Sequence, residues 1–456
     1  MRVLQVNTVV GTGSVGRITA SLYERSTAKG IDAYVGYGRG TAPEQMRAVK
    51  IGTSLDMYAH VLRNFLMGES GFGSARRTKA FLRELDELKP DLIHLHNIHG
   101  FYLQIELLFS YIKEKNMPVV WTLHDCWPMT GHCAYFDYVG CDKWKTGCHH
   151  CEQHRSAYPY ALFKDHSVLN YERKKAAFTG VQNLTIVTPS KWLADLVKQS
   201  FLREYPVEVI PNGIDRRIFR ASAAVQETQM DQFISGEQSP GMGQRSGTEQ
   251  FTRAGSYENG QNRTAEDRKI QLLGVANIWE KRKGFIYFQQ LARRLPENYH
   301  ITMVGLKPSQ IKEIEKDSLL KNKITGVTRT ENQQELADLY NTADLYINTT
   351  LEDNFPTTNL EALACGTPVI TFATGGSPEP IQGNPLIGAA VPATDVQALY
   401  TAVMEYAGRP KPVKECVKRA EQYDSTICFQ KYIDLYKSLY GKVTNESEGI
   451  HHHHQL

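Results

Sequence analysis

Residues 349–366 read TTLEDNFPTTNLEALACG, and this stretch carries the clearest structural signal in the chain. It lies between two apolar runs that predict buried strands. A loop at 353–356 leads into a helical pattern that starts near Thr358 and stops at Gly366. The first turn of such a helix offers free N–H groups and a partial positive charge, which suit a phosphate or the hydroxyls of a sugar. By itself the pattern also fits a surface loop before an ordinary helix.

Short apolar runs alternate with helical stretches on both sides of this segment. Such alternation predicts βαβ units and parallel sheets covered on both faces. Two groups of runs predict two domains, with ligands bound in the cleft between them, beyond the carboxyl ends of the strands. The predicted strands lie at 3–6, 91–96, 119–124, 184–187 and 207–210 in the first group, and at 270–275, 300–305, 323–327, 345–348 and 367–371 in the second.

Composition places the domain boundaries. Only 12 of the 48 residues from 221 to 268 are apolar, and Gly and Gln occur there without periodicity, which predicts a disordered or mobile insertion. We expect an N-terminal domain at 1–212 with a Cys-rich loop at 126–151, an interdomain segment at 213–268, a C-terminal domain at 269–425, a helix at 426–441 that packs back on the N-terminal domain, and a flexible tail at 442–456.

The overall composition excludes several classes of protein. With 456 residues, 41% of them hydrophobic, the chain is too long for a small disulfide scaffold and too apolar to be disordered throughout. A formal net charge of +3 does not favour nucleic acid as a partner. No apolar run of about 18 residues occurs, and residues 1–7 lack the apolar centre of a signal peptide, so we expect a cytoplasmic protein.

Six segments resemble landmarks of the family 4 retaining glycosyltransferases, and they occur in the order of that family. The most specific is the pair of acidic residues Asp353 and Glu361, which seven residues separate. The enzymes most similar in style build bacterial surface polysaccharides. The other five segments are PDLIHLH at 90–96, VIPNGID at 209–215, RKG at 282–284, ELADLY at 335–340 and TGGSPE at 374–379.

This resemblance implies a fold and a reaction. The fold is GT-B, an α/β class in which two Rossmann-like, doubly wound domains face each other across a cleft. The reaction is the retaining transfer of a sugar, of the hexosyl class, from a UDP- or GDP-sugar to a glycan or lipid-linked acceptor. The family chemistry needs no metal, and the chain has no Asp-x-Asp triplet, so no cofactor is expected for catalysis.

Residues of the second domain receive their roles from the resemblance. Glu361 is expected to hold the ribose hydroxyls of the nucleotide, and Asp353 to lie near the donor sugar and act in catalysis. Glu352 is adjacent, and most relatives have Glu at the first acidic position. Backbone N–H groups near the start of the helix are expected to meet the diphosphate or the sugar. These N–H groups belong to Phe355, Thr357 and Thr358.

A cationic turn after the strand at 270–275 provides the charges for the diphosphate. Lys283 occupies the family position of a diphosphate-binding lysine, where a fixed positive charge stabilises the departing nucleotide. Relatives usually carry an Arg near the position of Asn277, so Arg282 is expected to supply the second cation. Taken alone, the charged run 280–283 also fits a solvated turn.

In the first domain, the turn before the first helix resembles the family's glycine loop. Gly16 there allows the donor phosphate to approach the backbone closely. His124 ends a buried strand and matches a family histidine that faces the donor sugar, so we expect a catalytic role for its ring. His96 and Asn97 follow another strand and are expected to meet the acceptor. A histidine at a strand end is otherwise most often structural.

Five of the eight cysteines lie between Cys126 and Cys151, and two interpretations remain open. The pair Cys148 and Cys151 has the spacing of a zinc knuckle, but no second such pair follows or precedes it. The alternatives are a set of free thiols and a structural zinc site. The predicted zinc ligands are Cys133, Cys141, Cys148 and Cys151.

The segment 62–83 combines arginine and lysine residues with Phe65, Leu66, Met67 and Phe72. Such a surface suits an anionic membrane or a lipid-linked acceptor, and would place the protein at the inner face of the plasma membrane. The alternative is a solvated helix face.

Two other functions fit parts of the pattern. A nucleotide-sugar epimerase shares the architecture, but it needs an acid/base carboxylate pair in the cleft and turns over the donor without an acceptor. A non-catalytic nucleotide-sugar-binding protein needs only the binding residues.

Overall fold

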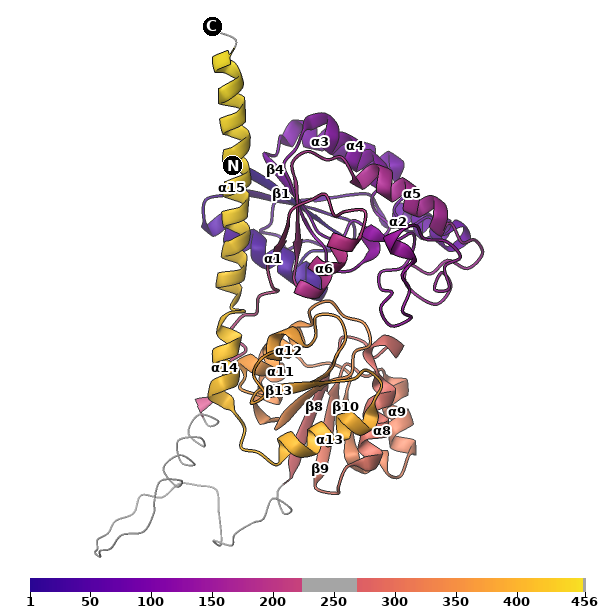
Figure 1. The fold of residues 1–456 in the computed structure, drawn as a ribbon, viewed down its shortest axis with the longest axis vertical. Helices are drawn as coiled ribbons and strands as arrows, with labels where there is room; N and C mark the ends of the chain where they lie inside the picture. Colours follow the sequence, from indigo (N-terminus) through magenta and orange to yellow (C-terminus); the bar gives the residue numbers. More distant parts are fainter. Residues whose placement is uncertain (224–268, 454–456) are drawn as a thin grey trace, which may run out of the picture.

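The computed structural model describes residues 1–223 and 269–453, which form two α/β domains flanked by one long C-terminal helix (Figure 1). The insertion predicted at 221–268 lies outside the described residues, except for its first three. Each domain contains one parallel sheet with helices on both faces, as the sequence pattern predicts and as the resemblance to the GT-B family implies.

The N-terminal sheet has seven parallel strands in the order β3-β2-β1-β4-β5-β6-β7. Its central strands are continuous apolar runs because helices bury both faces. The strands are β1 (Arg2–Asn7), β2 (Asp32–Tyr37), β3 (Ala48–Lys50), β4 (Leu92–Leu95), β5 (Val119–Thr122), β6 (Leu184–Thr188) and β7 (Val207–Val209), and the helices are α1 (Gly13–Ala28), α2 (Ser54–Met67), α3 (Ala75–Leu88), α4 (Ile105–Lys115), α5 (Ser167–Phe178) and α6 (Lys191–Gln199).

The C-terminal sheet has six parallel strands in the order β10-β9-β8-β11-β12-β13. The strands are β8 (Ile270–Val275), β9 (Tyr299–Val304), β10 (Ile324–Val327), β11 (Leu345–Asn348), β12 (Val369–Phe372) and β13 (Gly388–Val391), and the helices are α8 (Phe285–Arg294), α9 (Pro308–Lys316), α10 (Leu320–Lys323), α11 (Gln333–Thr342), α12 (Thr357–Ala364), α13 (Val396–Ala407) and α14 (Val413–Glu421).

The strand order of each sheet reverses at one place. In the N-terminal sheet this place lies between β1 and β4, and in the C-terminal sheet between β8 and β11. Loops that leave neighbouring strands at such a switch point run in opposite directions, which opens a crevice for a ligand. The glycine loop, the cationic turn and the 353–356 loop all leave strands at these two places.

Helix α15 (Ser425–His453) runs along the N-terminal domain, although it follows the C-terminal domain in sequence (Figure 1). Its residues Phe429, Tyr432 and Tyr436 share a buried cluster with Val3 and Val120 of the N-terminal sheet. The helix continues to His453, where the sequence predicted a flexible tail from residue 442; no proline follows Pro412 to interrupt it. Within the described residues, no helix is long and apolar enough to cross a membrane.

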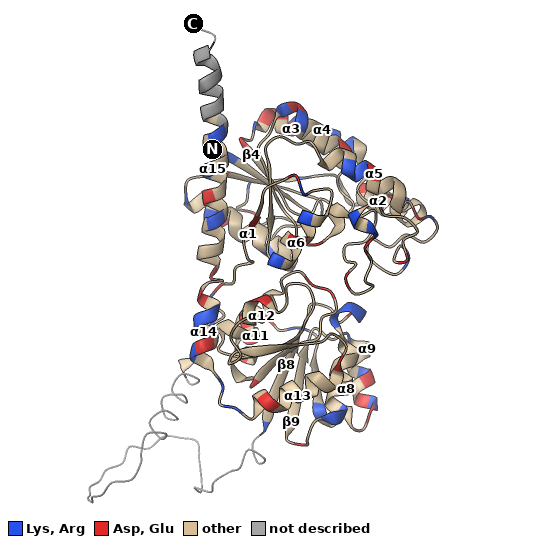
Figure 2. Ribbon diagram, in the orientation of Figure 1, with Lys and Arg blue, Asp and Glu red and all other residues tan. Residues whose placement is uncertain are grey.

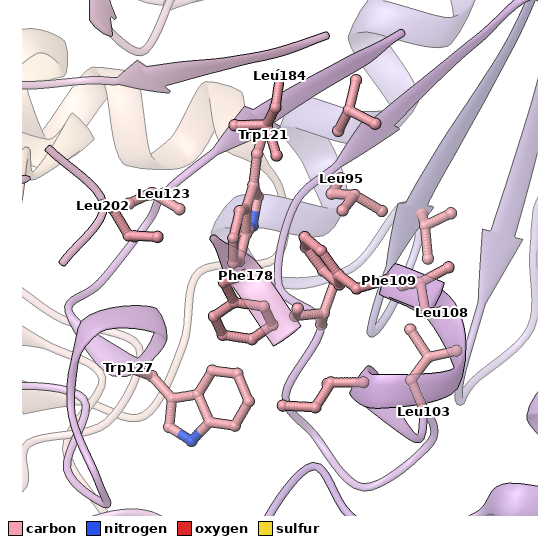
Figure 3. Close-up of a cluster of buried hydrophobic side chains, with 14 of the residues drawn as sticks. Leu95, Leu103, Leu108, Phe109, Trp121, Leu123, Trp127, Phe178, Leu184 and Leu202 are labelled. Carbon is pink, nitrogen blue, oxygen red and sulfur yellow. The ribbon is translucent and has the colours of Figure 1, made fainter. Parts of the chain in front are cut away.

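An aromatic cluster forms the centre of the N-terminal core (Figure 3). The rings of Phe109 and Phe178 lie 4.7 Å apart, and those of Trp121 and Phe178 lie 4.9 Å apart, in tilted and edge-to-face arrangements. Lys174 adjoins this cluster: its Nζ lies 3.5 Å from the ring centroid of Trp127 and donates to two backbone carbonyls. These contacts anchor the start of the Cys-rich loop to α5.

Candidate active site

The glycine loop after β1 is held in one tight conformation. The N–H of Gly11 donates to the carbonyl of Gly16 at 2.8 Å. A Cβ atom at Gly16 would lie 3.1 Å from Cγ2 of Val9, so a side chain there would crowd the turn. Helix α1 begins at Gly13 and has no acidic residue in its first turn, which leaves its N-terminal N–H groups suited to an anion.

A cavity of about 730 Å³ connects this loop to the C-terminal domain. It is lined by Gly11 and Arg17 of the first domain and by Thr357 and Glu361 of the second. Its volume lies within the range of small-molecule sites, about 300–1,000 Å³. His124, Lys283 and Asp353 are not among the residues that line this cavity.

Glu361 is oriented by a tyrosine. The hydroxyl of the buried Tyr340 donates to Oε2 of Glu361 at 2.8 Å. Burial raises the pKa of Glu361, while the hydrogen bond from Tyr340 opposes that rise. One oxygen of the Glu361 carboxylate is therefore held in place by Tyr340.

Lys283 and Asp353 form an ion pair, with 2.6 Å between Nζ and Oδ2. Lys283 lies at the end of the 3₁₀ turn Lys281–Lys283 after β8, and Asp353 lies in the loop after β11. Because β8 and β11 are neighbours, the fold brings together two residues that are 70 positions apart. Both side chains keep about a fifth of their surface exposed, at 22% and 17%, so a ligand can reach the pair.

Arg282 and Asn277 differ in their contacts. Nη1 of Arg282 donates to the carbonyl of Glu352 at 3.2 Å, and its guanidinium lies 5.9 Å from the ring centroid of Tyr135 in the Cys-rich loop. Arg282 therefore faces the first domain. Asn277 is exposed after β8, and its side chain makes no hydrogen bond to the described residues.

The loop before α12 joins the two domains, and sequence reasoning did not identify the residue responsible. The buried Nδ2 of Asn354 lies 3.3 Å and 3.2 Å from the carbonyl oxygens of Leu123 and His124, and its Oδ1 accepts from the hydroxyl of Ser190 at 2.5 Å. The next residue, Phe355, is buried. Thr357 and Thr358 start α12 and are half-buried. The only sequence signal for Asn354 was its place inside the acidic motif.

A second interdomain contact lies nearby. The carboxylate of Glu379 accepts from the N–H groups of Lys191 and Trp192, at 3.0 Å and 2.8 Å. These N–H groups belong to the first turn of α6, so a carboxylate of one domain stabilises a helix N-terminus of the other. Glu379 lies in the TGGSPE segment, which the resemblance had identified without a role for this residue.

His124 follows β5 and is partly exposed, whereas its neighbours are buried. Its Nε2 lies 3.0 Å from Nδ1 of His96. Burial lowers the pKa of His124 to about 4, so the ring is neutral at pH 7. His96 is 1% exposed and has both nitrogens engaged, so the predicted direct contact between His96 and the acceptor does not fit the structure. Asn97 is half-buried, and its backbone N–H donates to Asn7 Oδ1.

Two further carboxyl groups face the interdomain region. Burial raises the pKa of Asp137, in the Cys-rich loop, to about 6. Burial and the charge of Asp137 raise the pKa of Glu352 to about 7, while Arg282 opposes that rise. Sequence reasoning did not assign a role to Asp137, because nothing in its local pattern indicates which domain it faces.

The predicted zinc site is not formed. Cys133, Cys141, Cys148 and Cys151 are among the residues that line a cavity of about 210 Å³. In the part of the chain that the structure describes, no three His, Cys, Asp or Glu side chains are placed to hold a metal ion. All four cysteines are free thiols. The thiols of Cys133 and Cys151 contact each other, and this contact is a hydrogen bond between two thiol groups.

The predicted basic and apolar surface is formed only in part. Phe72 is buried, and Arg63 pairs with Glu69 at 2.8 Å. Phe65 and Leu66 remain exposed on α2, however, and the ring of Phe65 contacts Phe163 edge to face at 6.2 Å.

Comparisons with known families match each domain separately. Residues 15–217 match the family described as Glycosyltransferase Family 4, and residues 269–408 match the family described as Glycosyl transferases group 1. Together these two matches cover every strand of the two sheets except β1.

One curated protein matches part of the chain at low sequence identity. A protein of Escherichia coli (strain K12) named for colanic acid biosynthesis, the glycosyl transferase WcaC, is 25% identical over 227 residues; the match covers 47% of this chain and 55% of that protein. The chain thus spans about half the length of this curated relative.

Solved structures share the fold over nearly the whole chain. Sucrose-phosphate synthase from Thermosynechococcus elongatus has a TM-score of 0.66 at 14% identity, covering 97% of this chain and 99% of that one. Alr3699/HepE of Anabaena, solved with UDP-glucose, has a TM-score of 0.60 at 13% identity, covering 96% and 100%.

Proposed function

Because the chain belongs to the group 1/family 4 glycosyltransferases, we propose that it transfers a sugar from a nucleoside diphosphate sugar to an acceptor with retention of the anomeric configuration. One observation carries this proposal: the loop after β11 reaches the first domain, where Asn354 contacts the carbonyl of His124, and the same loop and the helix after it carry Asp353, paired with Lys283, and Glu361. Each titratable side chain among them has a chemistry that matches one part of such a donor.

In the proposed complex, the nucleoside lies in the 730 Å³ cavity, where Glu361 accepts hydrogen bonds from the ribose hydroxyls. The diphosphate lies between the N-terminus of α12 and Lys283. Lys283 is already paired with Asp353, so the incoming phosphate shares the ammonium group with this carboxylate. Asp353 and His124 then lie at the sugar end of the donor.

The proposed reaction uses positioning and electrostatics. Lys283, Arg282 and the N–H groups of α12 stabilise the negative charge that develops on the departing nucleoside diphosphate. The acceptor attacks from the face that the diphosphate leaves, and a phosphate oxygen takes the acceptor proton. This path requires no covalent intermediate on the enzyme, and domain closure excludes the water that would hydrolyse the donor.

We further propose that the acceptor is a glycan or lipid-linked sugar and that the enzyme meets an anionic bilayer from its cytoplasmic side. The name of the Escherichia coli relative supports polysaccharide biosynthesis. The supporting surface is the outer face of α2, where Leu55, Tyr58 and Leu62 are 81%, 64% and 57% exposed. Helix α3 beside it carries several Lys and Arg residues (Figure 2), and Arg77 pairs with Asp56 of α2 at 2.8 Å.

A donor panel tests the main proposal. Nucleoside diphosphates and their sugars are screened by thermal shift, and a ligand at about 100 times its Kd is expected to stabilise the protein by about 2.7 kcal/mol. Transfer to candidate acceptors is then followed by NMR of the anomeric proton in the product. Inversion of configuration, or the absence of stabilisation by any nucleotide, would refute the proposal.

Sedimentation with vesicles tests the membrane contact. Binding to vesicles of phosphatidylglycerol and phosphatidylcholine is expected for the unmodified protein, and Leu62→Ser is expected to weaken it. Leu386→Ser is the matched control, because Leu386 is 54% exposed on the other domain. If both variants bind the vesicles equally well, α2 is not part of the surface that contacts the membrane.

One observation favours the epimerase alternative. The raised pKa values of Asp137 and Glu352 are those of an acid/base pair poised near neutral pH. Incubating the donor without an acceptor distinguishes the two functions, since an epimerase converts the sugar under these conditions and a transferase releases at most a slow hydrolysis product.

A further inference from the structure

Three polar side chains cross the N-terminal sheet beneath the cleft. Gln5 lies on β1, His96 follows β4, and His124 follows β5, and these three strands are neighbours. Oε1 of Gln5 lies 2.9 Å from Nε2 of His96, and Nδ1 of His96 lies 3.0 Å from Nε2 of His124. Gln5 and His96 are 2% and 1% exposed, so water does not compete for these contacts. The contacts therefore form one continuous hydrogen-bonded chain.

A backbone carbonyl determines which atom donates in each of these hydrogen bonds. Nε2 of Gln5 lies 3.1 Å from the carbonyl oxygen of Thr19 on α1. A carbonyl only accepts hydrogen bonds, so the NH₂ group of Gln5 must face Thr19. The oxygen of the Gln5 amide then faces His96, and this oxygen also only accepts.

The protons of both histidines follow from that orientation. Because the Gln5 oxygen accepts, Nε2 of His96 carries the proton. Burial lowers the pKa of His96 well below its ordinary value, so the ring is neutral and its Nδ1 is bare. The bare Nδ1 accepts a hydrogen bond from Nε2 of His124. The planes of these two rings differ by only 19°, which is compatible with an N–H···N bond close to both ring planes.

The last group in this row of hydrogen bonds is a nitrogen that accepts a hydrogen bond. His124 is also neutral at pH 7, because burial lowers its pKa to about 4, and its single proton is on Nε2. Its Nδ1 is therefore unprotonated, and it has no hydrogen-bond partner among the described residues. His124 is the partly exposed member of a buried run, and Asn354 of the other domain contacts its carbonyl.

We propose that Gln5 and His96 are positioning residues that hold His124 in the tautomer with a bare Nδ1, which accepts a hydrogen bond from a hydroxyl of the donor sugar. The identity of this ligand rests on the proposed function. An ionised phosphate oxygen has no proton to donate, so the fixed tautomer favours a hydroxyl over a phosphate at this end of the cleft. The sheet thereby selects which end of the donor lies beside His124.

Nitrogen-15 NMR of the full-length protein, labelled in the histidine rings, tests this proposal directly. At neutral pH, the His124 resonances are expected to be those of the pure Nε2–H tautomer. In His96→Phe, which retains an aromatic ring but no acceptor, they are expected to move towards the average of both tautomers. The KM for the donor is expected to rise about tenfold, which corresponds to the loss of about one oriented hydrogen bond.

Two further variants complete the experiment. Gln5→Leu interrupts the chain one step earlier and is expected to shift the same resonances, so it serves if His96→Phe does not fold. Thr122→Val is the matched control, because it removes a hydroxyl 2.7 Å from Nε2 of the neighbouring His94 but lies outside the chain. It is expected to leave the His124 resonances unchanged.

The outcomes separate the two proposals. A proton on Nδ1 of His124 in the unmodified protein overturns the inference, as do unchanged His124 resonances in folded His96→Phe or Gln5→Leu. Sugar transfer that fails with every donor, combined with the expected resonances, overturns the proposed function and leaves the tautomer assignment standing.

Discussion

At the contact between Asn354 and His124, the N-terminal domain presents a neutral histidine ring, whereas the C-terminal domain presents an ion pair. On the N-terminal side, His124 is an uncharged ring backed by buried His96 and Gln5. On the C-terminal side, Lys283 and Asp353 form an ion pair. Neutral groups in a buried network discriminate hydroxyl donors, and fixed charges at strand ends bind phosphates. The two domains therefore present different chemistry at the same interdomain contact.

The largest expected effect is a different response of the two domains to acid. Burial lowers the pKa values of His60 and His132, both in the N-terminal domain, from 6.5 to about 4. The unfolded chain binds these protons first as the pH falls, so the stability that they provide is complete above pH 6.5 and is lost towards pH 4. As the pH falls through this range, protonation of each histidine is expected to lower the free energy of unfolding by about 3 kcal/mol.

The contribution of Glu352, in the C-terminal domain, to the free energy of unfolding changes with pH in the opposite direction. Burial raises its pKa to about 7, so the folded state holds this proton more tightly, and the stabilisation is complete below pH 4.5 and lost as the pH rises through 7. Urea unfolding at several pH values, followed by ¹⁹F NMR of fluorotryptophan at Trp121 and Trp279, separates the domains. His60→Gln is expected to move the N-terminal acid transition to lower pH. Parallel pH dependence of both signals would contradict the comparison.

The second effect tests the charged side of the cleft. Lys283→Met removes the ammonium group and leaves Asp353 without its partner. The kcat of transfer is expected to fall about 10²–10³-fold, because an oriented charge that stabilises a departing oxyanion contributes on that scale. Lys281→Met is the matched control on the same turn, where the side chain is exposed, and should retain activity. If the kcat of Lys283→Met equals that of the unmodified protein, Lys283 does not stabilise the departing group.

The third effect concerns the contact between the domains. Asn354→Ala removes a buried side chain that bonds to Ser190 and to two carbonyls of the other domain. The free energy of unfolding is expected to fall by about 1–3 kcal/mol, since buried partners lose their hydrogen bonds. Calorimetry is expected to show the two domains unfolding less cooperatively. Asn322→Ala, which changes an exposed residue, is the control. If both variants lower the free energy of unfolding equally, Asn354 has no specific role in joining the domains.

The smallest effect concerns α15. Tyr432→Phe deletes a hydroxyl that lies 3.1 Å from Oγ1 of Thr122 in the N-terminal sheet. We expect a loss of about 0.5–1.5 kcal/mol in chemical denaturation, because the ring and its packing remain. Tyr440→Phe, further along the helix, should have no measurable effect. A larger loss for Tyr440→Phe would place the docking contact elsewhere on α15.

Much of the fold was predictable from local pattern. The run Val119–Thr122 is wholly apolar except for one threonine, and it forms a strand buried on both faces. Strands β2, β3 and β13 were not predicted: Asp32–Tyr37 and Gly388–Val391 contain small or polar residues that weaken the pattern, and Ala48–Lys50 is only three residues long. The helix start at Thr357 was predicted to within one residue, since Pro356 and the apolar spacing indicate it.

The candidate site was less predictable. Sequence reasoning identified Lys283 and Asp353 but not their mutual ion pair, and it overlooked Asn354. It placed His96 against the acceptor, whereas the ring is buried between two other side chains. The roles of Asn277 and Thr358 stay predictions. In each case the missing information was the identity of a partner distant in sequence.

The sequence by itself determined the position of most strands, which loops carry glycine, cation or carboxylate, and which family the motifs resemble. These properties depend on neighbours within a few residues, so a linear pattern contains them. Only the tertiary structure decided that Gln5 contacts His96 and His96 contacts His124, because the strand order places residues about 90 and 28 positions apart side by side. The tertiary structure likewise placed four cysteines of the Cys-rich loop around one cavity, with the thiols of Cys133 and Cys151 in contact, which their spacing in the sequence could not show.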